Sequence, residues 1–115
     1  MKTIERHRIY FSSIIDQLST VKTPNEIRLV IRTLMNYLEE HHLVDKNYLD
    51  KNRLFVRCES YPELIEKQNT ETMLSFLTMI YRIDYIAPDS DAYMIYYNNG
   101  LLLRILKRLI LGLDV

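Results

Sequence analysis

The sequence predicts an all-α fold: one compact bundle of about five or six helices around a largely apolar C-terminal helix. Apolar residues recur every three or four positions through several long segments, which is the helical period. The 115 residues include only two glycines and three prolines, too few for the many turns of a β-sandwich or barrel. With 48% hydrophobic and 26% charged residues, the composition is that of an ordinary globular protein, so residues 1–115 are expected to form a single domain.

Two amphipathic helices are expected in the N-terminal third. The first runs from about Thr3 to Ser19, and its apolar face is formed by Ile4, Phe11, Ile14, Ile15 and Leu18. The second begins at TPNE, a capping box in which the Thr23 oxygen accepts from the Glu26 amide and a proline occupies the first helical position. This helix ends near Glu40, and its buried stripe comprises Ile27, Val30, Ile31, Leu34 and Leu38.

Residues 43–69 carry the weakest pattern in the chain. Asp45 or Asn47 is expected to cap a third helix that passes through Phe55, whereas the run LFVRC has the alternative of a short strand. A lone strand would have no sheet to join, so the helix is favoured. Pro62 then begins another short helical turn, PELIEKQ.

The segment TETMLSFLTMIYRIDYI predicts a long helix. Asn69 or Thr70 provides its cap, and an acidic residue follows near the positive end of the helix dipole. Its apolar stripe is formed by Met73, Phe76, Leu77, Ile80 and Ile83. The helix is expected to end before Pro88, because the residue that precedes a proline disfavours α geometry.

A short helix and the C-terminal helix complete the chain. Asp89 or Ser90 is expected to cap the short helix, which covers residues 92–97. The sequence NNG, which ends at Gly100, is typical of a left-handed helix stop. The last helix follows at once and is expected to stop at Gly112.

The C-terminal helix is apolar over most of its circumference. Its apolar residues are Leu101, Leu102, Leu103, Ile105, Leu106, Leu109 and Ile110. Its charged residues before Gly112 are Arg104, Lys107 and Arg108, whose i, i+3, i+4 spacing assigns them to one narrow stripe. Such a helix must be buried against other elements or a partner, so we expect it to be the central element of the bundle.

The segment TETMLSFLTMIYRIDYI, followed by a short acidic connection and NNGLLLRILKRL, resembles a bacterial family of small helical domains of unknown function. The earlier stretch YLEEHHLVDKNYLDK is similar to a helix end in that family, although the chain lacks the tryptophan that the family usually has. The residues that carry the resemblance are Asp45, Tyr48, Arg82, Asp84, Tyr85, Gly100, Lys107 and Arg108. The resemblance covers roughly Asn36 to Leu111. It implies a helical fold and a bacterial source, but it does not indicate any particular activity.

Composition narrows the classes of function. Fifteen basic and fifteen acidic residues cancel, so no global charge attracts nucleic acid or an anionic membrane. The two glycines lie too far apart for a phosphate-binding loop. The single cysteine excludes an internal disulfide and fits a reducing compartment. The N-terminus lacks the apolar core of a signal peptide, and charges interrupt the longest apolar run, so a cytoplasmic protein without a membrane segment is expected.

Neither a catalytic site nor a metal or cofactor site is expected. The His41-His42 pair lies among carboxylates in EEHHLVD, but it lacks the spacing of a metal motif, and a solvated helix end is favoured. Cys58 and a histidine such as His7 are the only candidates for a thiolate pair. The surrounding sequence RCES resembles no nucleophile motif, so a buried or incidental thiol is favoured.

Asp84 falls on the apolar stripe of its helix. A regular helix would point this carboxylate inward, where it must be paired or hydrogen-bonded. We therefore expect a buried ion pair or hydrogen bond with Arg82, Arg104 or a tyrosine hydroxyl, which favours an internal tie over a ligand site.

Tyrosines are numerous, and three of them gather in the short helix. Tyr93 and Tyr97 share a face at i, i+4, with Tyr96 beside them. Tyrosine combines a large contact area with a polar tip and is enriched at interfaces, which supports an interface hypothesis for this helix. The amphipathic edge of the core is the favoured interpretation, because such residues are usually partly buried. Leu29 is out of register with the buried stripe of its helix, so it is expected at the surface or at an interface.

These observations favour a small, non-catalytic bacterial protein–protein interaction module, regulatory or adaptor-like, that binds another protein or itself. A homodimer is included, because a chain of this size is not expected to surround its apolar last helix fully. The alternative is a nucleic-acid-associated regulator in which Arg104, Lys107 and Arg108 contact phosphates. The zero net charge argues against this alternative.

Overall fold

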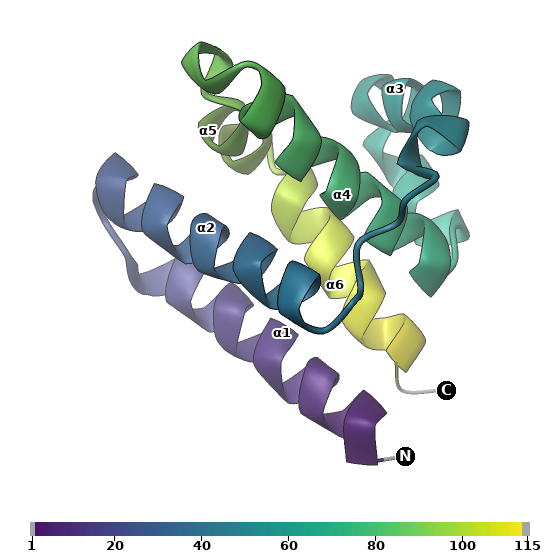
Figure 1. Ribbon diagram of the computed structural model, residues 1–115, viewed down its shortest axis with the longest axis horizontal. Helices are drawn as coiled ribbons and strands as arrows, with labels where there is room; N and C mark the ends of the chain where they lie inside the picture. Colours follow the sequence, from purple (N-terminus) through teal and green to yellow (C-terminus); the bar gives the residue numbers. More distant parts are fainter. Residues whose placement is uncertain (1, 114–115) are drawn as a thin grey trace.

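The computed structural model describes residues 2–113, with side chains described for residues 6–112, and over this range the protein is all-α (Figure 1). The α-helices are α1 (Lys2–Thr20), α2 (Pro24–Glu40), α3 (Asn52–Ser60), α4 (Thr70–Ile86), α5 (Ala92–Asn98) and α6 (Leu101–Leu113). The short 3₁₀ helices are η1 (Tyr48–Lys51), η2 (Pro62–Lys67) and η3 (Pro88–Ser90). The predicted all-α fold is confirmed, and the LFVRC segment is helical because it forms part of α3.

Helices α4 and α6 lie side by side at the centre of the molecule. α6 packs against α4, α1, α5 and η2, while α1 and α2 form an antiparallel pair on one side (Figure 1). α3, η1 and η2 gather at the opposite side, next to α4. The radius of gyration is 13.2 Å, close to the value of about 13 Å for a folded chain of about 100 residues. None of the described helices is both long enough and apolar enough to cross a membrane.

Every α-helix contributes to one cluster of buried apolar side chains. The buried residues of α2 are the predicted stripe with Met35 in addition, and those of α1 are Phe11, Ile14 and Leu18. Ile15 is partly buried, and Ile4 lies outside the residues whose side chains are described. On α6 the buried face consists of Leu101, Leu102, Ile105, Leu106 and Leu109. The helical periodicity therefore identified most of the core.

Two of the predicted helix starts are confirmed. The Thr23 hydroxyl oxygen accepts from the Glu26 amide at 3.2 Å and donates to the Glu26 carboxylate at 2.7 Å. Asn69, rather than Thr70, caps α4, because its side-chain oxygen accepts from the Thr72 amide at 2.8 Å. Each cap satisfies a backbone N–H that the helix itself leaves without an acceptor.

Two predicted caps are wrong, the one at Asp45 or Asn47 and the one at Asp89 or Ser90. Neither Asp45 nor Asn47 makes a side-chain cap bond to η1 or α3. Asp89 and Ser90 fall within η3, and α5 begins after Asp91, a residue with the positive φ of 55°. The Asp91 side chain makes no cap bond either, because it pairs with α2 as described below.

A polar strip on α4 holds the loop that follows α2. Ser75 and Thr78 are buried at 1% exposure each, on the same side of α4. The Thr78 hydroxyl oxygen accepts from the Asp45 amide at 2.9 Å, and the Ser75 hydroxyl donates to the Asp45 carboxylate. The Asp45 carboxylate also accepts from the Asn47 amide at 2.8 Å. These bonds compensate for burying hydroxyl groups in an apolar core.

The two glycines have different roles. Gly100 has a φ of +82°, so the predicted left-handed stop between α5 and α6 is confirmed. The predicted stop at Gly112 is wrong, because α6 continues through Leu113. A Cβ atom at Gly112 would lie 1.9 Å from Oγ1 of Thr70. Gly112 therefore allows the end of α6 to approach the first turn of α4 closely.

Gly112→Ala is expected to lower the free energy of unfolding by about 1 kcal/mol. Overpacking against Thr70 costs roughly 2 kcal/mol, and the better helix propensity of alanine returns up to about 1 kcal/mol. Thr70→Ala removes the obstructing oxygen and leaves a Cβ atom 3.3 Å away, so Gly112→Ala should cost much less in that background. Urea denaturation of the four variants of this cycle measures the coupling between the two positions, and zero coupling would contradict the close approach.

Candidate functional site

Helix α5 does not present its tyrosines to solvent as a group. Tyr93 and Tyr96 are buried, with exposures of 6% and 8%, and Tyr96 meets Phe55 of α3 edge-on with ring centroids 5.5 Å apart. Tyr97 is half-buried, and its hydroxyl donates to the Leu18 carbonyl at 3.0 Å. The predicted tyrosine interface is therefore wrong for Tyr93 and Tyr96. The reason is that α2, α4 and α6 all pack around this short helix.

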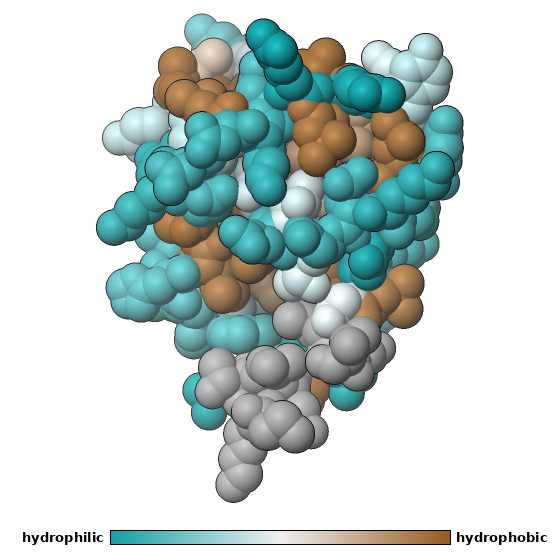
Figure 2. All heavy atoms as spheres, turned by 90° about the vertical axis from the view of Figure 1, so that its right-hand side faces the viewer, coloured by the Kyte–Doolittle hydropathy of each residue, from teal (hydrophilic) through white to brown (hydrophobic). Residues whose placement is uncertain are grey.

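Several large apolar side chains remain exposed, and Leu29 is among them at 64%. The others are Ile9, Leu49, Val56, Tyr61, Tyr85, Ile86, Ile95 and Leu111. Figure 2 shows one face of the molecule, on which hydrophobic side chains form separate patches bordered by hydrophilic ones. The surface position of Leu29 is confirmed, and its role in an interface stays a prediction.

Asp84 is half-buried, and it forms no ion pair with any residue that the structure describes. Burial raises the pKa of its carboxyl, the nearby charge of Arg32 opposes this effect, and that of Asp91 adds to it. The predicted buried ion pair at Asp84 is therefore wrong. The end of α4 leaves this carboxylate partly in solvent, so that burial does not demand a partner.

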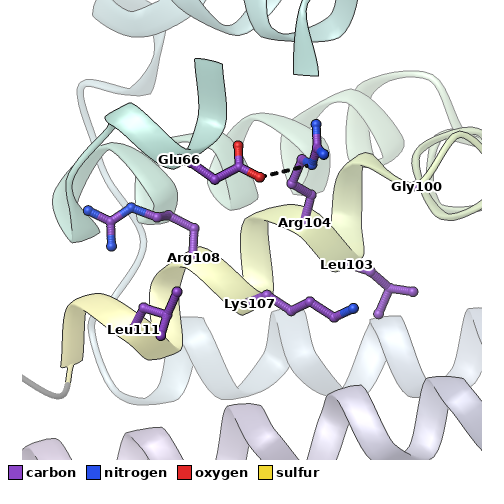
Figure 3. Close-up of a pocket in the computed structure, with 7 residues that line it drawn as sticks. All are labelled: Glu66, Gly100, Leu103, Arg104, Lys107, Arg108 and Leu111. Carbon is purple, nitrogen blue, oxygen red and sulfur yellow. Dashed lines mark ion pairs between the residues drawn. The ribbon is translucent and has the colours of Figure 1, made fainter. Parts of the chain in front are cut away.

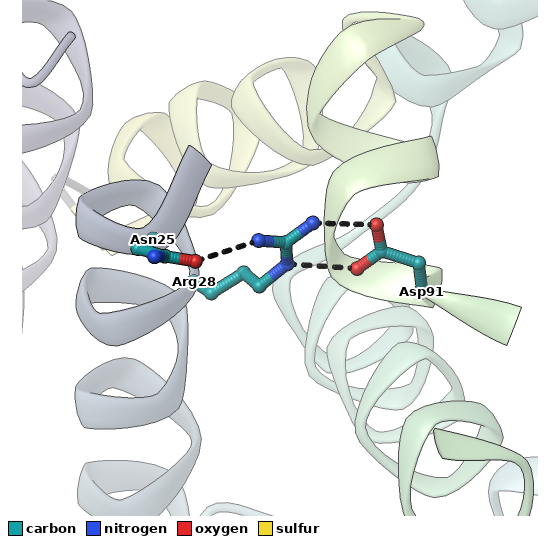
Figure 4. A network of polar contacts seen from close by, with 3 residues as sticks. All are labelled: Asn25, Arg28 and Asp91. Carbon is teal, nitrogen blue, oxygen red and sulfur yellow. Dashed lines mark hydrogen bonds and ion pairs between the residues drawn. The ribbon is translucent and has the colours of Figure 1, made fainter. Parts of the chain in front are cut away.

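The ion pair in this region joins α2 to the start of α5 instead (Figure 4). Arg28 donates from Nε and Nη2 to the two carboxylate oxygens of Asp91, at 3.0 and 2.8 Å. Asn25 accepts a third bond from the same guanidinium at 3.0 Å. The bidentate geometry links α2 to the start of α5, although the partly exposed pair contributes little free energy.

His7 and His41 take part in an aromatic cluster between α1 and α2. His7 Nδ1 lies 2.6 Å from the Tyr37 hydroxyl, and the Tyr37 ring stacks on Tyr10 with centroids 3.6 Å apart. The His41 ring lies against Tyr37 at 4.1 Å. Over the described residues, no three His, Cys, Asp or Glu side chains converge as metal ligands do. Cys58 is buried in α3, where burial raises the pKa of its thiol.

Arg104, Lys107 and Arg108 lie together on the open face of α6, as their spacing predicted. Arg104 forms an ion pair with Glu66 of η2, with Nε 3.2 Å from the carboxylate oxygen. Within the described part of the chain, Lys107 and Arg108 form no ion pair. Nε of Arg108 is buried and has no hydrogen-bond partner. The stripe therefore keeps two cations that no acidic side chain neutralises.

These side chains line an open groove of about 440 Å³, called the α6 groove from here on (Figure 3). The lining residues are Glu66, Gly100, Leu103, Arg104, Lys107, Arg108 and Leu111. Arg104 and Glu66 reach toward each other from α6 and η2, and Lys107 extends along α6 toward Leu103 (Figure 3). Leu111 is 60% exposed and Leu103 is half-buried. The groove thus offers apolar contact area and positive charge in one place.

The sequence pattern missed two residues of the α6 groove. Leu111 lies seven positions after Arg104, so helical spacing alone assigns it to the same stripe. Glu66 comes from the weakly patterned segment 43–69, and only the packing of η2 against α6 brings its carboxylate to Arg104. No local signal in the sequence indicates this pairing.

A second open surface lies where η1 meets the end of α4. Two neighbouring grooves of about 440 and 230 Å³ share the side chains of Tyr48, Arg82 and Ile86. Tyr85 and Ile86 stand exposed there at 69% and 74%. Four residues that carry the family resemblance line the larger of these grooves: Asp45, Tyr48, Arg82 and Tyr85.

No protein-family model, curated protein or solved structure matches this chain. The resemblance to a bacterial family of small helical domains therefore stays a prediction. A functional proposal has to start from the chemistry of the open surfaces, and the α6 groove has the more distinctive chemistry of the two.

Proposed function

We propose that this chain is a small non-catalytic protein–protein interaction module, regulatory or adaptor-like, that binds its partner through the α6 groove. The observation that supports this proposal is the exposure of Leu111 beside Arg104 and Arg108 in one open groove. Protein interfaces combine apolar contact with a charged rim, and they are enriched in arginine. Catalysis would need convergent acid, base or nucleophilic groups, and the lining offers only Lys107 and Glu66, of which Glu66 is engaged with Arg104.

The partner in this proposal is another protein, and a homodimer is the special case in which it is a second copy of this chain. We further propose a bacterial cytoplasmic setting, which rests on the family resemblance and on the unpaired Cys58. Sedimentation over a range of concentrations distinguishes a monomer, which needs a different partner, from a self-associating chain.

A nucleic-acid-associated regulator is the second candidate, supported by the two cations without acidic partners. However, Glu66 engages Arg104, so only Lys107 and Arg108 of the three cations remain available to phosphates. Lys107 and Arg108 alone provide a weak contact without sequence readout. A protein partner can also contact the two leucines of the groove with apolar side chains, whereas phosphates cannot.

Leu111→Glu is expected to reduce capture of the native partner by about tenfold or more, because it puts a carboxylate on the apolar part of the groove. The measurement is quantitative mass spectrometry of proteins captured from a lysate of the native host by the tagged chain. Leu29→Glu is the matched control, since Leu29 is equally exposed, at 64% against 60%, and lies on α2. Both substitutions change the charge equally, and circular dichroism verifies that both variants fold.

Equal capture by the wild-type chain and by Leu111→Glu would remove the α6 groove from the proposal. Loss of capture with Leu29→Glu alone would move the interface to the outer face of α2. Homodimer formation is judged by sedimentation of the same two variants.

A further inference from the structure

The α6 groove is positively charged, although the chain as a whole has a net charge of zero. Its lining has three cationic side chains and a single carboxylate, that of Glu66, which is paired with Arg104. Lys107 and Arg108 have no acidic partner among the described residues, and a carboxylate is a strong charge-assisted partner for both side chains. The groove is therefore complementary to an acidic ligand.

Apolar contact area lies on both sides of the free cations. Leu103 and Leu111 are eight positions apart, which corresponds to about 12 Å along the axis of α6. Lys107 and Arg108 lie between them in the sequence and on the same open groove. A matching ligand carries two apolar side chains roughly 10–12 Å apart, with carboxylates between them. This pattern excludes a free phosphate or a small carboxylate as the full occupant.

A helix satisfies this pattern better than an extended segment does. An extended segment that binds by adding a strand needs the free edge of a sheet, and residues 2–113 form no strand. A helix satisfies its own backbone, and residues at i, i+3, i+4 and i+7 share one face.

We infer that the α6 groove binds an acidic amphipathic helix of a partner protein, with apolar residues at i and i+7 and acidic residues at i+3 and i+4. The apolar pair contacts Leu103 and Leu111, and the acidic pair contacts Lys107 and Arg108. This inference rests on the proposed function and adds the chemistry of the partner to it.

The test uses a fluorescein-labelled synthetic peptide of about 14 residues with this pattern, in an otherwise alanine-rich sequence that favours helix. Fluorescence anisotropy with the full chain should give saturable binding that weakens as salt is added. Lys107→Glu/Arg108→Glu is expected to weaken binding by about tenfold or more. Lys22→Glu/Lys46→Glu has the same change of charge outside the α6 groove, so it should alter the affinity by less than about twofold.

Lys107→Glu alone keeps the test valid if the double variant fails to fold, because Lys107 is exposed; we expect about threefold weaker binding. A peptide with lysines in place of the glutamates should not bind. Equal binding of this peptide, no binding of the acidic one, or unchanged affinity of the groove variants would overturn the inference. Tighter binding of duplex DNA or of an RNA oligonucleotide would overturn it in favour of the second candidate.

Different results would contradict the proposed interaction module and the proposed acidic helix. If Leu111→Glu abolishes capture of the native partner while the acidic peptide does not bind, the acidic helix is wrong and the interaction module stands. If Leu111→Glu has no effect on capture and the peptide does not bind, both are wrong.

Discussion

We expect Phe55→Ala to lower the free energy of unfolding by about 3–4 kcal/mol. Phe55 is 2% exposed, and its ring lies edge-on to Phe76 of α4 at 5.2 Å and to Tyr96 of α5 at 5.5 Å. It therefore joins three helices, and alanine leaves a cavity between them. Since domains of this size have a total stability of about 5–15 kcal/mol, the loss is a large fraction. Chemical denaturation followed by circular dichroism measures it as a lower midpoint.

Two variants control for trivial causes. Val56 is the next residue in the same helix and is 52% exposed, so Val56→Ala should change the stability by less than about 0.5 kcal/mol. Phe55→Leu keeps most of the volume and should cost about 1–1.5 kcal/mol. If Phe55→Ala cost no more than Val56→Ala, α3 would not be docked in the core as described.

Asp45→Ala is expected to lower the free energy of unfolding by about 2 kcal/mol, because it removes a carboxylate that accepts two hydrogen bonds. These bonds tie the loop after α2 to the buried strip of α4 through Ser75. The measurement is again chemical denaturation. Asp50→Ala is the matched control, since Asp50 is exposed in η1 and should contribute almost nothing.

The pH dependence of the stability distinguishes the contribution of the Asp45 charge from that of the shape of the side chain. The bonds from the Ser75 hydroxyl and the Asn47 amide hold the pKa of the Asp45 carboxyl below its ordinary value of 3.8. The unfolded chain therefore binds this proton first as the pH falls, so the stabilisation is complete above pH 3.8 and is lost as the pH falls through the folded pKa. Asp45→Asn should be less stable than wild type at neutral pH and approach it at low pH. A difference that stays constant with pH would contradict a role for the charge.

The sequence was informative where structure depends on neighbours along the chain. The capping box at Thr23 and the cap at Asn69 act within one helical turn, and both are formed. The left-handed stop at Gly100 is likewise a local conformational requirement. Periodic apolar residues then identified the buried faces of α1, α2 and α4, because a helix of several turns has room for a buried and an exposed face.

Predictions failed where the outcome depends on residues distant in the sequence. Tyr93 and Tyr96 lie on a helix of only seven residues, and packing from three other helices buries them. The Tyr97 hydroxyl reaches a carbonyl 79 positions away, a partner that no local pattern indicates. Asp84 was expected inside because it continues the apolar stripe of a regular helix, whereas the last turn of α4 emerges into solvent at Tyr85 and Ile86.

The residues of the α6 groove were likewise only partly predictable from the sequence. The common face of Arg104, Lys107 and Arg108 follows from helical spacing, and the structure has them on one groove. The neutralising role of Glu66 depends on how η2 folds back onto α6. This one contact changes the stripe from three available cations to two, and so changes which partner it suits.

The ribosome releases α6 after all the other helices described here, yet α1, α4 and α5 pack against it. Synthesis proceeds at roughly 5–20 residues per second. The apolar face of α1 therefore stays uncovered for several seconds, until residues 101–109 have been synthesised. During that time the nascent chain can pair α1 with α2 but cannot close its core. Apolar surface that is buried in the finished protein is therefore exposed on the nascent chain, and such surface favours aggregation.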